Sequence, residues 1–465
     1  MIDGLRPHRE TKPTGLTWLP AIPACWEVHR AKRTFREVDE RSVRGDEELL
    51  SVSHITGVTP RSQKNVTMFM AESYEGHRLC RPADIVVNTM WAWMAAVGVS
   101  RQVGIVSPSY GVYRPRLPDS FIPRFLDYLL RTEVYRAEYV RASRGITTSR
   151  LRLYPEDFLG IPIVQPPLEE QRLITRFLDT HGALTARLIR AKQQLIKLLE
   201  EQKEAIVHCA VIRGLDPNVR LKHSDIPWLG DVPAHWQLRK LKQLTYFLNG
   251  LAFKPSDWEA TGTPIIRIQN LNGSDIFNYT SREDLSGRLR IKPGDLLFSW
   301  SGNRGTSFGP FIWNRHFEGY LNQHIFKLQG YSLHREYFAH LLRAVTRHIE
   351  DETHGIIGLV HVTKPELGSV VVPVAPEEEQ RSITEWIEKN TARLTAASDG
   401  ARQEIALLRE FRTRLVADVV TGNLDVRAAA AALPELTESE PIDEPPDSDD
   451  LEEAIDDVEN EAVAA

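Results

Sequence analysis

The sequence predicts a mixed α/β protein with two similar globular domains, joined by two long helices that pair as an antiparallel coiled coil about a pseudo-twofold axis. Three observations support this: an internal repeat over nearly the whole chain, two long amphipathic helical patterns, and short apolar segments typical of buried strands. The length of 465 residues suits two to four domains. The 42% of hydrophobic residues is enough for sizeable cores.

The repeat is clearest where the pattern Pro-x-Glu-Glu-Gln-Arg occurs, at 167–172 and again at 376–381. From there, residues 167–216 align with 376–425 without a gap. Upstream, WLPAIPACW at 18–26 returns as WLGDVPAHW at 228–236, and RPADIVV at 81–87 returns as KPGDLLF at 292–298. Because the order is the same in both halves, we divide the chain into a domain (1–165), a helical spacer (166–216), a second domain (217–374), a second spacer (375–427) and an acidic tail (428–465).

Each spacer is predicted to be one helix of about 45 residues. Pro167 and Pro376 suit a first helical turn, acidic residues follow where the helix dipole favours them, and Gly214 and Gly422 stand where a helix would stop. A helix this long needs a partner for its apolar stripe, and the other copy is the obvious one. The residues predicted to pack between the two helices are Ile196, Leu199, Ile206, Ile405, Leu408 and Leu415.

The globular halves are predicted to combine short buried strands with amphipathic helices. The strand candidates are 84–88, 160–164, 264–268, 295–299 and 369–374, and the helix candidates are 125–136 and 337–349. Strand order cannot be derived from the sequence.

The charge is distributed unevenly along the chain. The net charge is −6, but the segment from Ala428 onward holds 14 acidic residues and no Lys or Arg. Without that segment, 57 basic residues face 49 acidic ones, a net charge of +8. The tail is expected to be disordered, because it has too few apolar residues to offset the entropy of ordering. It is interpreted as a solubilising extension or as a mimic that competes with DNA for the basic body.

Several classes of function lack their sequence motifs. The chain has no GxxxxGK[ST] phosphate loop, no Asn-Pro-Pro-aromatic motif for adenine methylation, and no metal-ligand spacing of His, Cys and acids. The three cysteines are isolated, no signal peptide is recognisable, and the longest apolar run, 90–99, is too short to span a bilayer. We therefore expect a cytoplasmic protein with no metal, no cofactor and no catalytic centre of its own.

The loops after the strands carry side chains that suit nucleic acid. Asn can pair with adenine and Arg with guanine in the major groove, whereas Ser, Thr and Lys commonly hold phosphates. For each residue taken singly, an ordinary exposed polar side chain is the simpler explanation, and Trp91, Trp93 and Trp300 suit a core better than base contact. Asp84 and Asp295 are interpreted as strand or turn residues rather than catalytic acids. The candidates for DNA contact are Arg61, Lys64, Asn88, Thr89, Trp91, Arg101 and Arg144 in the first half, and Arg267, Asn270, Ser301, Asn303, Arg304, Gln323 and His354 in the second.

The doubled order of W-L-x-x-x-P-x-x-W, then (K/R)-P-x-D before apolar residues, then P-x-E-E-Q-R and a long helix, resembles the specificity (S) subunit of Type I restriction–modification systems. The resemblance covers residues 16–427. It implies that each globular half is a target recognition domain that reads one half of a split, non-palindromic site on double-stranded DNA. It also implies partners: two modification (methyltransferase) subunits, which carry S-adenosylmethionine, and restriction subunits, which use ATP. Two features depart from the pattern, namely Ala83 where the second half has Gly294, and the acidic tail.

Two other functions are compatible with the same architecture. A coiled-coil scaffold could bind proteins rather than DNA at its globular ends; steep weakening of binding with salt would distinguish DNA binding from it. A fused enzyme of the same system is disfavoured because the methylation motif is missing.

Overall fold

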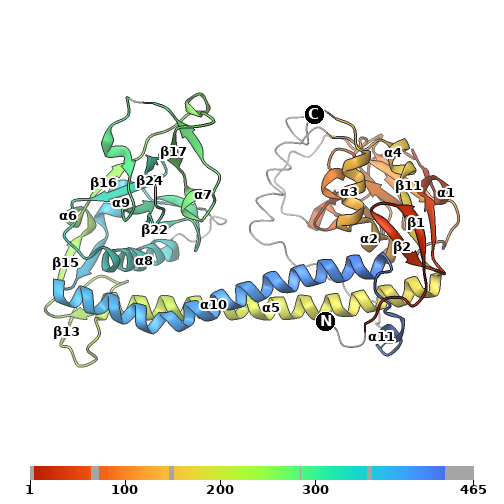
Figure 1. The fold of residues 1–465 in the computed structure, drawn as a ribbon. Helices are drawn as coiled ribbons and strands as arrows, with labels where there is room; N and C mark the ends of the chain where they lie inside the picture. The colour runs from red at the N-terminus through yellow and green to blue at the C-terminus, as the bar shows by residue number, and fades with distance from the viewer. Residues whose placement is uncertain (1–4, 64–72, 146–150, 283, 353–358, 435–465) are drawn as a thin grey trace. The chain divides into compact units, whose positions relative to one another are not determined.

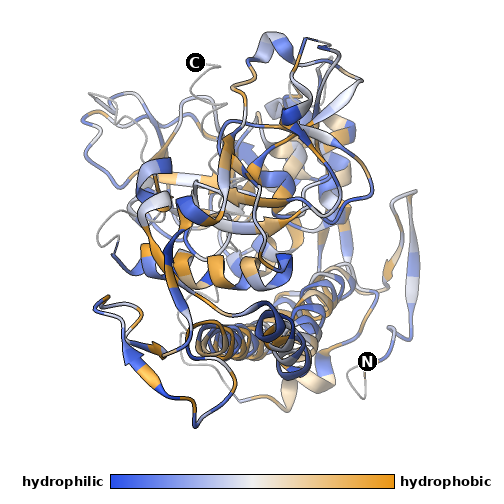
Figure 2. Ribbon diagram, turned by 90° about the vertical axis from the view of Figure 1, so that its left-hand side faces the viewer, coloured by the Kyte–Doolittle hydropathy of each residue, from blue (hydrophilic) through white to orange (hydrophobic). Residues whose placement is uncertain are grey.

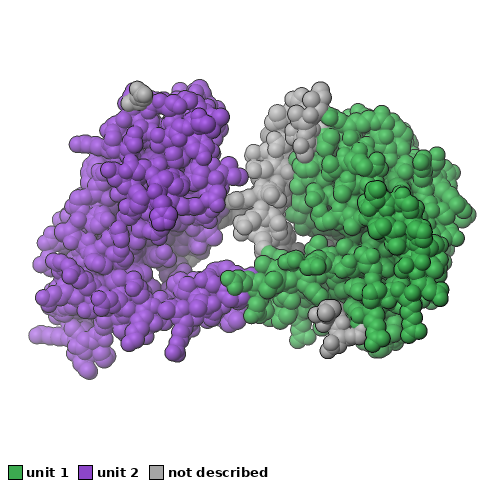
Figure 3. Space-filling model, in the orientation of Figure 1, with its two compact units in different colours: residues 1–192, 403–465 green, residues 193–402 purple. Residues whose placement is uncertain are grey.

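The protein is described from a computed structural model, in which residues 5–63, 73–145, 151–282, 284–352 and 359–434 are described. The chain forms two compact units (Figure 3): unit 1 contains residues 1–192 and 403–465, and unit 2 contains residues 193–402. Each unit therefore combines one globular part with a segment of each long helix. Lys64, His354 and the tail from 435 onward lie outside the described residues.

The two long helices are α5, Leu168–Arg213, and α10, Glu377–Val420 (Figure 1). Both begin directly after the predicted prolines, Pro167 and Pro376. Gly214 and Gly422 follow their ends with φ angles of 74° and 81°, a left-handed conformation that glycine adopts without steric cost. The predicted lengths and ends of both helices are confirmed.

The helices run antiparallel within each unit, as predicted. In unit 1, Lys192 of α5 forms an ion pair with Glu404 of α10. In unit 2, Glu200 of α5 accepts hydrogen bonds from Ser398 (3.0 Å) and Arg402 (3.1 Å) of α10. Residues later in α5 thus pair with residues earlier in α10, as expected for antiparallel helices.

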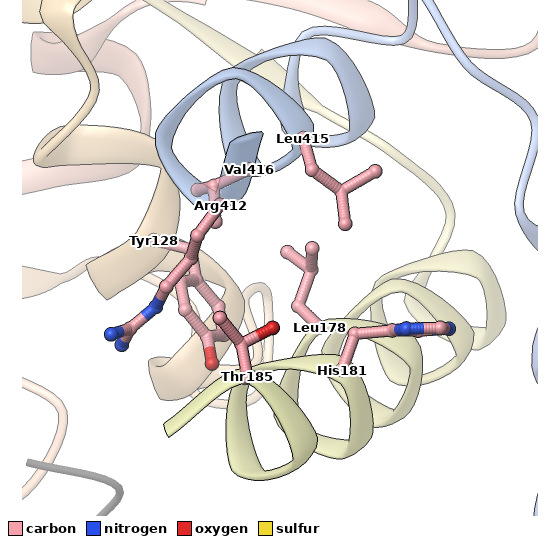
Figure 4. A pocket seen from close by; sticks show the side chains of 8 residues that line it. Tyr128, Leu178, His181, Thr185, Arg412, Leu415 and Val416 are labelled. Atoms are coloured by element: carbon pink, nitrogen blue, oxygen red, sulfur yellow. The ribbon is translucent and has the colours of Figure 1, made fainter. Parts of the chain in front are cut away.

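Apolar side chains fill the space between the helices. In unit 1, Leu178 of α5 lies near Leu415 and Val416 of α10, and Tyr128 from a neighbouring helix points into the same place (Figure 4). Of the six residues predicted to pack between the helices, Ile405 and Leu415 are buried, and Ile196, Leu199, Ile206 and Leu408 are half-buried. Half-burial is expected where only two helices share an apolar stripe.

Each unit contains a four-stranded sheet, and the two sheets have matching strand order. The sheet of unit 1 has the order β4-β11-β8-β9, and the sheet of unit 2 has the order β16-β24-β20-β22, with all neighbours antiparallel. The strands are β4 Phe35–Glu37, β8 Ile85–Val87, β9 Val97–Val99, β11 Gly111–Pro115, β16 Tyr246–Asn249, β20 Leu296–Ser299, β22 Gly309–Ile312 and β24 Ile325–Gln329. The sequence repeat is therefore also a repeat of topology.

Smaller elements repeat in the same order. In each unit a hairpin is followed by an antiparallel pair whose second strand leads into a long helix, and short helices pack beside that pair. These elements are β1 Thr11–Leu16, β2 Leu19–Pro23, β3 Glu27–Arg30, α1 Ala31–Thr34, α4 Pro155–Gly160 and β12 Pro162–Gln165 in unit 1, and β13 Leu221–His223, β14 Asp231–Pro233, β15 Gln237–Lys240, α6 Leu241–Leu244, α9 Lys364–Ser369 and β26 Val371–Val374 in unit 2.

The remaining strands differ between the units. Unit 2 has a second four-stranded sheet of order β18-β17-β23-β19, whereas unit 1 has two two-stranded sheets, β5-β6 and β10-β7. Their bounds are β5 Leu50–Ser53, β6 Gly57–Pro60, β7 Arg78–Cys80, β10 Gly104–Val106, β17 Thr263–Ile266, β18 Asn278–Thr280, β19 Arg290–Ile291 and β23 Gly319–Leu321, and a further pair in unit 2 joins β21 Ser301–Asn303 to β25 Leu359–His361. The units thus share one frame and differ in what is attached to it.

One predicted helix is interrupted. The expected helix 125–136 is two helices, α2 Pro123–Leu130 and α3 Glu133–Ala142, because Thr132 is extended and its side chain caps α3 by accepting from the backbone N–H of Tyr135. The expected helix 337–349 lies within α8, Arg335–Glu352. In each of the five segments predicted as strands, four or fewer residues form a strand. Residues 160 and 369, predicted as the first residues of strands, are instead the last residues of short helices.

A buried glutamine from the Pro-x-Glu-Glu-Gln-Arg pattern joins each long helix to its globular part. Gln171 accepts a 2.8 Å hydrogen bond from the backbone N–H of Ile122 and donates to the carbonyl of Pro166. Gln380 makes the same two bonds, with the N–H of His334 and the carbonyl of Ala375, also at 2.8 Å. The acceptor oxygens satisfy an N–H at the start of α2 and of α8, which explains why the motif needs glutamine.

The main cores lie where the sheet and helices of each unit meet, and Trp26 and Trp236 are fully buried in them. The ribbon coloured by hydropathy shows apolar residues on these elements and hydrophilic residues in many connecting loops (Figure 2). Among the described helices, none is both long and apolar enough to cross a lipid bilayer.

Candidate nucleic-acid interface

A matching turn precedes the central strand of each sheet. In unit 1, Asp84 accepts from the N–H of Arg81 (2.9 Å) and forms two 2.8 Å hydrogen bonds with the guanidinium of Arg114. In unit 2, Asp295 accepts from the N–H of Lys292 (2.6 Å) and pairs with Lys327. Both aspartates are thus turn residues, one of the two roles expected from the sequence, and each holds a cation on the neighbouring strand of its sheet.

The residue before each aspartate adopts a left-handed backbone. Gly294 has a φ of 87°, and Ala83, the departure from the pattern, has a φ of 72°. A left-handed backbone raises the free energy of an alanine by roughly 1–2 kcal/mol, a cost that glycine does not have. The hydrogen bonds of the turn are nevertheless retained, so the alanine strains the turn without abolishing it.

In unit 2, Trp300 directly follows β20, which ends at Ser299. Its indole N–H donates to the carbonyl of Gln323 (2.9 Å), and its carbonyl accepts from the N–H of Val362 (2.9 Å). The ring lies 5.1 Å from the ring of His324 and 4.8 Å from that of His361. Trp300 is therefore neither a pure core residue nor free to stack on a base, because its ring packs against the two histidines.

Unit 1 has the same arrangement at Thr89. The hydroxyl donates to the carbonyl of Ser109 (2.9 Å), and the carbonyl accepts from the N–H of Leu153 (2.9 Å). Thr89 itself is buried. The side chains of Ser109 and of Arg152, which precedes Leu153, are exposed.

The other candidates in unit 1 fall into two groups. Asn88 is buried, donating to the Tyr110 hydroxyl (3.1 Å) and accepting from the N–H of Met90, so its amide supports the loop rather than reaching solvent. Arg101 is exposed, whereas Arg61 in the short helix Arg61–Gln63 is partly exposed.

Two further candidates in unit 1 have clear partners. Trp91 stacks on Trp93, with ring centroids 5.7 Å apart. Arg144 is exposed but paired with Asp157 (2.7 Å), and this hydrogen bond raises the pKa of its guanidinium. A DNA phosphate would have to compete with that carboxylate.

Among the candidates in unit 2, Asn270 does not reach the surface. It is 2% exposed; its oxygen accepts from the N–H of Arg267, and its amide nitrogen donates to the carbonyls of Ser274 and Ile276. Asn270 thus closes the turn that follows β17, which argues against base contact. Helix α7, Ile268–Leu271, forms there.

The remaining candidates in unit 2 lie at or near the surface. Arg267 donates to Asn278 (3.0 Å) and lies over the ring of Trp258. Asn303 and Arg304 are exposed, while Ser301, opposite His361 in the β21–β25 pair, is half-buried. Gln323 adjoins His324, with 2.9 Å between their side-chain nitrogens.

The site has an electrostatic character that no single residue shows. The pKa of His324 is lowered, first by burial and then by the nearby positive charges of His361 and Arg267. These three groups therefore lie close enough to interact, and the lowered pKa favours the neutral form of His324. Within the described part of the chain, none of the three pairs with a carboxylate within 4 Å.

Sequence reasoning missed His324, His361 and Arg152. One signal could have found two of them: Arg152 and His361 occupy matching places just before Leu153 and Val362, which bond to Thr89 and Trp300. No comparable signal existed for His324, because its neighbours come from distant segments. Among the described residues, no group of three His, Cys or acidic side chains is arranged to hold a metal ion.

Fold and site together define a class: a duplicated α/β protein that presents the same backbone frame twice, with different surface side chains. Comparison with known proteins finds a match for part of the chain. Residues 233–406 match the Type I restriction modification DNA specificity domain, in agreement with the resemblance seen in the repeat.

The relatives and a solved structure agree. The chain is 28% identical over 229 residues to the Type I restriction enzyme EcoKI specificity subunit of Escherichia coli (strain K12), covering 47% of each chain. It is 26% identical over 208 residues to the EcoBI specificity subunit of Escherichia coli, covering 44% of this chain and 42% of that one. The matches thus span about half the length of these relatives. A structure described as showing complex assembly and conformational transition of the type I R-M system shares the fold, with a TM-score of 0.57 and 17% identity over 86% of this chain and 99% of the other.

Proposed function

We propose that this protein is the DNA-specificity subunit of a Type I restriction–modification complex. Each unit reads one half of a split, non-palindromic target, so that partner subunits methylate adenine or cleave the DNA. The observation that carries this proposal is the repeated frame around Thr89 and Trp300, where matched backbone hydrogen bonds hold unlike side chains. Two readers with one fold and different surfaces suit a target with two different halves.

The chemistry belongs to the partners in this proposal. Modification subunits supply S-adenosylmethionine and the methyl transfer, and restriction subunits supply ATP-driven cleavage, while this chain is not an enzyme and needs no cofactor. The relatives support this division by name, since they are specificity subunits of restriction enzymes. We place the protein in the cytoplasm with its DNA.

The long helices offer a place for a partner that binds twice. Leu198 of α5 and Leu407 of α10 occupy matching positions of the repeat and are 52% and 64% exposed. The repetition of this exposed leucine in both copies is the observation on which we base a docking surface. Two modification subunits, one for each helix, fit this arrangement.

The proposal is tested by methylome sequencing. Cells that carry this gene with its modification partner should contain methylated adenines in one split sequence, and cells without the gene should lack them. Methylation that persists without this gene would contradict the proposal.

The alternative, a scaffold whose ends bind proteins, is separated from it by salt. Binding of the assembled complex to a target duplex should fall steeply between 50 and 200 mM salt, on the order of 10³-fold for six or more phosphate contacts. Flat salt dependence, with a protein ligand at the globular ends, would favour the scaffold.

A further inference from the structure

The duplication provides a comparison within one chain. Thr89 and Trp300 occupy the same place: each lies five residues after the turn aspartate and accepts a hydrogen bond from the N–H of Leu153 or Val362, at 2.9 Å in both units. Each also donates from its side chain to a carbonyl in the turn before the next strand, that of Ser109 or Gln323, again at 2.9 Å. The backbone frame is thus the same in the two units.

The side chains on this frame are different. Thr89 is replaced by Trp300, and Arg152 by His361, the residues before Leu153 and Val362. Ser109 and His324 form a third matched pair. When the register between β8 and β11 is continued past the strand ends, Ser109 lies opposite Thr89. The register between β20 and β24, continued in the same way, places His324 opposite Trp300. Positions that hold the shared fold retain residue type: the turn aspartates, the buried glutamines and Trp26 and Trp236 all match.

Two domains that bind different ligands with one fold need the same backbone structure and different surface side chains. The two units have this combination here. Exposed Arg152 and His361 can donate hydrogen bonds to acceptors on base edges, and a guanidinium does so with two N–H groups at once. In unit 2, the guanidinium of Arg267 places a positive charge near His324 and His361, which suits a polyanion. The ring of Trp300 holds both histidines in place.

We propose that these matched positions are where each unit reads its half-site: Arg152 and Ser109 determine the bases read by unit 1, and His361 and His324 determine those read by unit 2. Trp300 is a positioning residue for the two histidines. This inference rests on the proposed function and names the surface through which that function is carried out.

The test uses the full-length chain assembled with its modification partner and a duplex library with a randomised central segment. The variants are Arg152→Ala and His361→Ala, both at exposed side chains whose loss should leave the fold intact. The matched controls are Lys32→Ala and Lys242→Ala, exposed lysines at equivalent places on α1 and α6. Bound duplexes are sequenced, and melting temperatures verify folding.

Arg152→Ala should reduce base preference about 10-fold or more at one or two positions of one half-site, and His361→Ala should do so only in the other half-site. The lysine controls should leave both preferences unchanged. The assignment is overturned if either variant affects both half-sites or neither, or if it weakens binding to all duplexes equally, which would make the residue a phosphate contact. If the wild-type complex selects no split sequence at all, it is the proposed function that fails, so the two failures are distinguishable.

Discussion

At the scale of single residues, His340 of α8 makes the stability of unit 2 depend on pH. Its Nδ1 is buried without a hydrogen-bond partner, and burial, with smaller effects from Arg343 and Lys203, lowers its pKa from 6.5 to about 4. The folded state therefore keeps His340 neutral at a pH where the unfolded chain binds a proton. The stability that this contributes is present above pH 6.5 and is lost as the pH falls toward 4.

We expect His340→Leu to flatten that pH dependence. Between pH 7 and 4.5 the wild type should lose on the order of 2–3 kcal/mol more than the variant, because one pKa unit corresponds to about 1.4 kcal/mol. Urea unfolding at both pH values measures the difference. His316→Leu, which removes an exposed histidine of the same unit, is the control. Equal losses in wild type and His340→Leu would show that His340 does not titrate in this way.

The sequence predicted the roles of single residues where local chemistry decides them. Asp84 and Asp295 were expected to be strand or turn residues, and each accepts from the N–H three residues earlier, so both belong to turns. The exposure of Asn270 and the clustering of His324 with His361 depend on segments far apart in the chain. No local pattern encodes those contacts, so Asn270 was placed among surface candidates and the histidines were missed.

At the scale of elements, Gln380 joins α10 to α8. It is 4% exposed and makes two 2.8 Å hydrogen bonds to backbone groups that have few alternatives. Gln380→Ala leaves a buried N–H and a buried carbonyl unsatisfied and should lower the free energy of unfolding by about 2–4 kcal/mol. Gln171→Ala should have a similar effect in unit 1.

Chemical unfolding measures this effect, and Gln202→Ala, an exposed glutamine on α5, should change stability by less than about 0.5 kcal/mol. A Gln380→Ala loss no larger than that control would mean that the motif glutamine does not hold the helix to the globular part.

The exposed leucines of the helices lead to a different prediction. Leu198→Glu and Leu407→Glu each place a charge on a surface that the proposal assigns to a modification subunit. The melting temperature of the isolated chain should change little, because both side chains are more than half exposed. Assembly should weaken, with one variant leaving one modification subunit bound and the double variant leaving none, as measured by mass photometry. Unimpaired assembly of the double variant would place the docking surface elsewhere.

The long helices could be predicted because their start signals, apolar stripe and terminal glycines are all local. The break between α2 and α3 could not, because Thr132 reads equally well as an exposed helical residue or as a cap. The Leu198 and Leu407 side chains illustrate the same limit: apolar spacing alone does not say which of two stripes faces the partner helix.

At the scale of the whole molecule, the repeat predicted that the two halves share a fold, and the matching sheet orders confirm it. It could not give the strand order itself, since pairs such as β4 with β11 join segments more than 70 residues apart. Nor could it show that the halves diverge in their second sheets. Divergence there leaves the shared frame intact, so the two domains should be exchangeable parts.

The last prediction follows from that modularity. Replacing residues 17–165 with the matching domain of a relative should change one half of the methylated sequence and leave the other half unaltered. The graft must retain the contacts that join unit 1 to its helices: a tryptophan at the place of Trp26, which lies against Gly422, and a backbone N–H at the place of Ile122, which bonds to Gln171. Methylome sequencing reads both halves at once, and a graft of the chain's own domain is the control. If both halves of the target changed, or neither did, one domain could not be the reader of one half-site.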